Sequence, residues 1–148
     1  MRVRALWALF GLLACVEGSI AAPPRAAATG REDIVWKPLP GPGKKFALEG
    51  GGYFTYEFSE KPKIGMVIVK VQVFDKAKAQ VAPFAVTGRS DMPSMAGAHD
   101  SGDVEFKLNR RNDYLLPVNV VMPGEWEVKL TFQKDGKPFL HAFLRLHV

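Results

Sequence analysis

The chain has 148 residues, of which 47% are hydrophobic and 24% are charged, and its formal net charge is +5. This composition is typical of a globular protein and excludes a chain that is disordered over most of its length. The basic residues are spread out and form no long run, so they indicate a solvated surface and argue against a nucleic-acid partner.

Residues 1–22 predict a signal peptide. Arg2 and Arg4 precede an uncharged apolar run that ends before Glu17. This run is far shorter than the roughly 18 residues that a membrane-spanning helix needs. We therefore expect the protein to reach the periplasm or to be secreted, and not to be integral to a membrane.

Two ways of processing this signal stay open. Cleavage behind the small residues at 19–22 would release a soluble protein, whereas Leu12-Leu13-Ala14-Cys15 resembles a lipobox, whose cysteine carries a lipid anchor. Cys15 is the only cysteine in the chain, so the mature protein would have neither a disulfide nor a thiolate metal site. Any soft metal ligand would then have to be a methionine.

Residues 23–45 are rich in alanine, proline and glycine. Such a segment cannot bury enough apolar surface to offset the entropy lost when it becomes ordered. We expect an extended tether here, followed by one folded domain over residues 46–148.

Beyond residue 46, apolar and polar residues alternate with a period of two, which is typical of half-buried strands. Turn signals such as Pro123-Gly124 and Asp135-Gly136 separate the alternating runs. The pattern predicts an all-β, immunoglobulin-like antiparallel sandwich of about seven strands. The expected strands lie at residues 53–58, 67–74, 84–87, 104–108, 114–121, 126–132 and 140–147.

The connection at residues 90–102 carries the main functional lead, because it holds Met92, Met95 and His99. Thioether sulfur is a soft ligand that favours Cu(I), and imidazole suits copper in either oxidation state. If consecutive strands run up and down, every methionine beyond the initiator falls near one end of the sandwich. Met122 would then be a fourth ligand.

The same residues have a plain structural explanation. Methionine is a flexible gap-filler, and an apolar residue at the end of each strand can simply plug the sandwich. For Met66 and Met122 taken alone this explanation is favoured, while for the group at 92–99 both explanations stay open. His147 returns to the same end, but we expect it and the mid-strand His141 to be surface residues.

No enzyme motif stands out, and we expect the protein not to be an enzyme. His99, Asp100 and Ser101 are neighbours in the chain, but a catalytic triad must converge in space and no nucleophile-elbow pattern surrounds the serine. The glycines at 50–52 precede a strand and do not open a helix, so they do not form a phosphate-binding loop.

The order of several short motifs resembles the YtkA-like domain family, over residues 52–148. The resemblance implies a small immunoglobulin-like sandwich outside the cytoplasm, with a lipoprotein or secretory signal. Its relatives occur beside copper-handling and oxidase-assembly proteins, which implies an envelope partner of that kind and, indirectly, copper. Within the motifs, Gly124 and Trp126 are explained as a turn residue and a core anchor. The motifs are Ile64-Gly65-Met66, Met92-Pro93-Ser94-Met95 with a following histidine, Tyr114, and Met122-Pro123-Gly124-Glu125-Trp126.

Two functions follow as hypotheses. In the first, the protein is a periplasmic or envelope-attached carrier that binds and delivers Cu(I) through Met92, Met95, His99 and Met122. In the second, it is a non-catalytic module whose methionine-rich end binds an envelope partner without a metal. Convergence of the four side chains favours the first hypothesis, and burial in the core or an exposed patch favours the second.

Overall fold

A computed structural model describes residues 34–148 of the chain. The predicted signal peptide, Cys15 and residues 23–33 of the predicted tether lie outside the described residues. Within the described part, regular structure consists of strands and of one short 3-10 helix, η1 (Pro93–Met95). No helix among these residues is long and apolar enough to cross a membrane.

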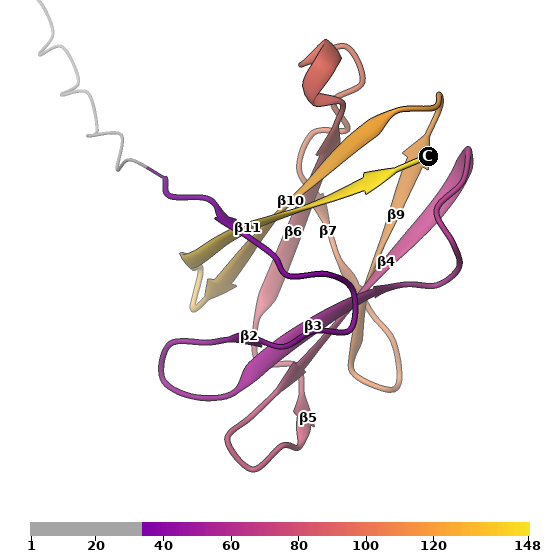
Figure 1. Cartoon of the computed structure of the whole chain (residues 1–148). Helices are drawn as coiled ribbons and strands as arrows, with labels where there is room; N and C mark the ends of the chain where they lie inside the picture. The colour runs from indigo at the N-terminus through magenta and orange to yellow at the C-terminus, as the bar shows by residue number, and fades with distance from the viewer. Residues whose placement is uncertain (1–33) are drawn as a thin grey trace, which may run out of the picture. The chain divides into compact units, whose positions relative to one another are not determined.

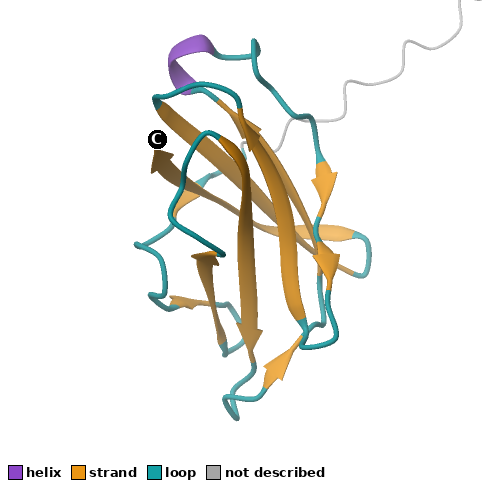
Figure 2. Ribbon diagram, turned by 90° about the vertical axis from the view of Figure 1, so that its right-hand side faces the viewer, coloured by secondary structure: helices purple, strands orange, loops and turns teal. Residues whose placement is uncertain are grey.

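The strands form two sheets that pack against each other, as Figures 1 and 2 show. This arrangement confirms the predicted all-β sandwich. In the first sheet the order is β1-β11-β10-β6-β7, and in the second it is β2-β3-β4-β9-β8, with β5 paired to β4. The longer strands are β3 (Tyr53–Phe58), β4 (Gly65–Phe74), β6 (Ala85–Asp91), β9 (Asp113–Val120), β10 (Glu125–Lys134) and β11 (Lys137–His147). The short strands are β1 (Lys37–Pro38), β2 (Phe46–Ala47), β5 (Gln80–Val81), β7 (Val104–Glu105) and β8 (Lys107–Leu108).

The strand expected at residues 104–108 is in fact two short strands in different sheets. Strand β7 pairs with β6, whereas β8 pairs with β9. The chain changes sheet at Phe106, whose backbone N–H donates to the carbonyl of Val86 and whose side chain is buried. Burying this aromatic ring between the sheets explains why the continuous alternation in the sequence does not give one continuous strand.

The sandwich also begins earlier than residue 46. Strand β1 pairs in parallel with β11, and the N–H of Leu39 donates to the carbonyl of Phe143 at 2.8 Å. Leu39 packs against the core. The predicted tether is therefore corrected for residues 37–45, because a few apolar side chains and an edge position that tolerates Pro38 suffice to hold this proline-rich segment on the sheet.

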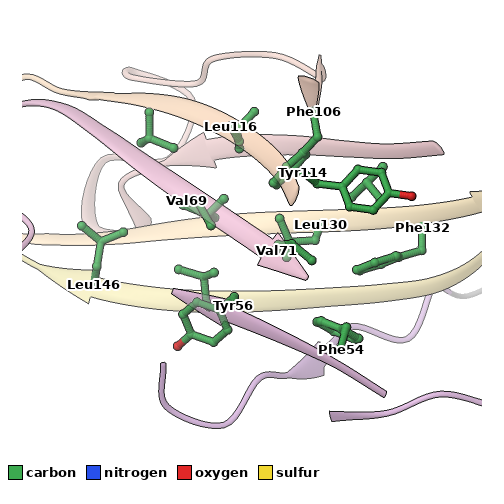
Figure 3. Close-up of a cluster of buried hydrophobic side chains, with 14 of the residues drawn as sticks. Phe54, Tyr56, Val69, Val71, Phe106, Tyr114, Leu116, Leu130, Phe132 and Leu146 are labelled. Carbon is green, nitrogen blue, oxygen red and sulfur yellow. The ribbon is translucent and has the colours of Figure 1, made fainter. Parts of the chain in front are cut away.

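The core lies between the sheets and is filled by the inward-facing residues of the alternating strands (Figure 3). Gly88 of β6 shows how closely the sheets approach, since a Cβ atom at this position would collide with the side chains of Leu116 and Phe106. The side chains of the two sheets interdigitate, which is typical of sandwich packing. The largest fully buried side chains are those of Trp126, Phe54, Phe132, Leu116, Leu130 and Leu144.

Candidate functional site

The predicted copper ligands lie at one end of the sandwich. Figure 1 shows η1, the turn between β9 and β10, and the C-terminus at this end. The strand registers agree, because Asp91 at the end of β6 is paired with Glu127 near the start of β10, and Glu125 is paired with His147. We call this region the methionine end, defined by residues 91–102 and 121–126.

Met92 lies in the core and not on the surface. Its side chain is only 3% exposed. A Cβ atom built on Gly124 would lie 2.9 Å from Met92 Cε, so the thioether packs directly under the turn that precedes β10. Gly124 also has a φ of +136°, a conformation that side-chain-bearing residues rarely adopt, and it therefore has two reasons to be glycine.

Trp126 lies close to two of the other predicted ligands. It is almost fully buried, and its indole Nε1 donates to the backbone carbonyl of Met122 at 3.1 Å. The imidazole of His99 lies near the indole ring, with 6.0 Å between the two ring centroids. Met122 is half-buried and packs against the core. Met92, His99 and Met122 thus all lie around the turn from 122 to 126.

Met95 belongs to the same loop but points to a different environment. It ends η1, its N–H donates to the carbonyl of Met92 at 3.0 Å, and its side chain is 46% exposed. Met66, at the start of β4, is 54% exposed and pairs with Asn119 of β9 within the second sheet. Packing of a methionine into the end of the core therefore explains the buried Met92 and the half-buried Met122. It does not explain the exposed Met66 and Met95.

Asp91 shapes the loop that carries Met92 and Met95. Its Oδ1 accepts the N–H of Met92 at 2.8 Å and its Oδ2 accepts the N–H of Gly97 at 2.7 Å. The bond from Gly97 is the main cause that lowers the pKa of the Asp91 carboxyl. The carboxylate is thus the point on which both ends of the methionine-bearing turn are held.

A second set of contacts holds the part of the loop at residues 100–102. Arg89 forms a two-point ion pair with Asp100, through Nε to Oδ1 at 2.7 Å and through a terminal nitrogen to Oδ2. This hydrogen-bonded guanidinium, followed by the N–H of Gly102, lowers the pKa of Asp100 to about 2. Ser90 and Ser101 add two bonds between the strand and the loop, each at 2.9 Å.

These contacts also decide how the three neighbours His99, Asp100 and Ser101 are arranged. The Ser101 hydroxyl accepts the N–H of Ser90 and donates to the carbonyl of Gly102, while Asp100 faces Arg89. The serine hydroxyl and the aspartate carboxylate are thus both engaged in holding the loop.

The chemistry that the methionine end offers is that of soft and borderline ligands. Met92 packs against this turn, Met122 belongs to it, and His99 lies near Trp126. Two thioethers and an imidazole suit Cu(I) better than a hard cation. A hollow of about 300 Å³ opens beside His99, lined also by Ser90, Pro117, Asn119 and Trp126 but by none of the methionines. Among residues 34–148, no three His, Cys, Asp or Glu side chains gather as a metal-binding group.

A second hollow lies on the outer face of the first sheet and borders the same loop, and no sequence motif indicated it. It has a volume of about 550 Å³. We call it the sheet groove: its floor is formed by β6 and β10, one wall by Trp36 and His141, and the other by the loop that holds Asp100. The one signal in the sequence was Trp36, a large aromatic residue inside a segment otherwise typical of a linker.

His141, expected to be a surface residue in mid-strand, lies in this groove. Its Nδ1 is 3.1 Å from Thr131 Oγ1, and its ring meets the Trp36 indole edge-on, with 5.1 Å between the centroids. His147 is exposed near the methionine end.

Comparisons of the chain with protein-family models, with curated proteins and with solved structures give no match.

Proposed function

We propose that this protein is an exported Cu(I)-binding protein, and that the methionine end is its metal site. The observation that supports this proposal is the gathering of Met92, His99 and Met122 around the turn that leads into β10. The predicted signal peptide supports export, and the resemblance to YtkA-like domains agrees with copper.

The ligand roles differ with burial. Met92 offers a thioether inside a dry environment, where a hydrated cation is at a disadvantage and a soft ion that sheds water is favoured. His99 stands beside an open hollow, so its imidazole is the ligand through which the ion enters from solvent or leaves to an acceptor. Met95 is exposed one turn away and is the residue that would hand the ion over to an envelope partner.

The test is a Cu(I) titration of the full chain against a competing chelator. Met92→Leu and Met122→Leu replace the thioether by an alkyl side chain of similar volume, so they preserve the core. Met66→Leu is the matched control, because it removes the same atom from an exposed residue on a different strand. We expect stoichiometric binding that weakens in the first two variants and in His99→Gln, and that is unchanged in Met66→Leu.

Failure of the full chain to compete with the chelator would overturn the copper proposal, and so would equal losses in the control variant. The second hypothesis, a metal-free interaction module, is favoured by two observations at this end of the molecule. The first is that Met92 is buried in the core, and the second is an exposed apolar surface. Ile64, Met66, Met95 and Val121 all expose large apolar surface there. Such a surface is typical of a partner contact. Cross-linking from position 95 to an envelope protein without copper would support it.

A further inference from the structure

We propose that the sheet groove binds a neutral saccharide. The inference is independent of the copper proposal, because the groove lies on the outer face of the first sheet and is lined by neither His99 nor a methionine. Its volume of about 550 Å³ is within the range of natural small-molecule sites, roughly 300–1,000 Å³.

Most of the charged groups of the groove already have a partner within the protein. Arg89 is bound at two points by Asp100, and the ammonium of Lys129 lies 3.6 Å from a Glu127 oxygen. The carboxylate of Asp91 accepts two backbone N–H groups of the neighbouring loop. Asp103, which also lines the groove, is largely exposed and has only a long contact with Arg89, at 4.0 Å. An anionic ligand would have to displace Asp100 from Arg89 or Glu127 from Lys129, whereas a neutral ligand leaves these contacts intact.

The groups left for a ligand are neutral and polar. Thr87 and Thr131 lie side by side on paired strands, and Thr131 fixes His141 through Nδ1. Among the described residues, the hydrogen bonds found leave the imidazole Nε2 and the indole N–H of Trp36 without a partner. Hydroxyl, imidazole and indole groups together donate and accept in the pattern that sugar hydroxyls require.

Trp36 supplies the apolar element that a sugar ring also needs. The ammonium of Lys129, on the floor of the groove, lies over the indole, 5.4 Å from the ring centroid. The imidazole of His141 packs edge-on against the same indole. Strand β1, which follows directly, anchors the backbone to β11. The ring is therefore fixed before a ligand arrives, and an ordered aromatic surface beside polar groups suits a molecule with one apolar face and a polar rim.

The test is calorimetric titration of the full chain with two neutral trisaccharides, maltotriose and cellotriose. Trimers of glucosamine and of galacturonic acid serve as the cationic and anionic comparators. We expect at least one neutral trisaccharide to bind more tightly than either charged trimer. Trp36→Ala should weaken this binding about tenfold or more, which corresponds to the loss of one good aromatic contact and its hydrogen bond.

Two further variants keep the outcome clear. Thr131→Val leaves the fold and Trp36 in place but removes a floor hydroxyl, and it should also weaken binding. Tyr53→Ala is the matched control, because Tyr53 also carries a lysine, Lys45, at 4.5 Å over its ring but lies on the other sheet outside the groove. Absence of binding by both neutral trisaccharides, tighter binding of a charged trimer, or equal loss in Tyr53→Ala would overturn the proposal.

Discussion

The core of the sandwich and the loop at its methionine end are held in shape by different forces. In the core, alternate residues of β4 and β10 are buried between the sheets, and their positions are fixed by packing. In the loop, η1 has no buried residue, and its course follows from hydrogen bonds to Asp91, Asp100 and Ser101. The core should therefore respond to changes in side-chain volume, and the loop to changes in hydrogen-bonding groups.

The largest effect should come from shortening a core side chain. Phe132 is fully buried and packs against Phe54, with 4.7 Å between the ring centroids. Phe132→Ala should lower the free energy of unfolding by about 3–5 kcal/mol. Phe139→Ala is the control, since that ring touches the same cluster but is partly exposed. Urea denaturation measures both, and equal losses would show that packing does not govern this region.

A smaller effect should follow when a buried polar group in the second sheet is altered. Asp113 is 6% exposed and accepts the side-chain amides of Gln72, Gln80 and Asn109 at 2.7–2.9 Å. Burial opposes its ionisation, but these bonds outweigh burial and lower the pKa of the carboxyl.

Asp113→Asn replaces one acceptor oxygen by a donor that faces the amide of Asn109. We expect a loss of about 1–3 kcal/mol in the free energy of unfolding. Asp135→Asn, in the exposed turn before β11, should leave stability unchanged, because asparagine tolerates the positive φ of that position. A stable Asp113→Asn variant would show that the hydrogen bonds to the carboxylate do not hold this region.

In the loop, removing the Asp91 carboxylate should change local amide exchange more than global stability. Asp91→Ala removes the acceptor for the N–H groups of Met92 and Gly97, so both amides should exchange faster with solvent while global unfolding changes little. Hydrogen exchange followed by NMR measures this difference. Asp103→Ala provides the control on the same loop, because its contact with Arg89 is long, at 4.0 Å. Unchanged protection of Gly97 in Asp91→Ala would contradict the proposed anchoring.

The smallest effect should come from acid. The pKa of Asp100 is about 2 in the fold against an ordinary value of 3.8, so its ion pair with Arg89 stabilises the loop above pH 3.8. This contribution is lost as the pH falls through the folded pKa. NMR should therefore show the resonances of residues 98–102 shifting between about pH 4 and pH 2. Arg89→Gln should move the titration of Asp100 upward, and an unchanged midpoint would exclude the pair as the cause.

The core could be predicted from the sequence because burial leaves a local signal. A strand buried on one side alternates apolar and polar residues, and Trp126 to Phe132 did so without interruption. The same signal could not show that the chain changes sheet at Phe106, because both short strands around it keep the alternation. The position of the predicted copper ligands at one end of the sandwich could also be predicted. If consecutive strands run up and down, alternate connections lie at the same end.

The sheet groove could not be predicted, because it is made by residues that only the tertiary structure brings together. Trp36 reaches Lys129 and His141 through the parallel pairing of β1 with β11, a contact between distant parts of the chain. The pairing rests on two residues and leaves no periodic pattern. Likewise, the role of Asp91 depends on which backbone N–H groups face its carboxylate, and residue types alone do not give this.

The tight packing at Gly88 also has a consequence for how this fold can vary. Because Gly88 has no side chain, Leu116 and Phe106 can pack against its backbone. The side chains at these three positions therefore have to fit together into one limited space in the core. In sequences that share this sandwich, a larger residue at the position of Gly88 should appear together with a smaller one at 116 or 106. Such correlated substitution would trace the contact between the two sheets from sequences alone.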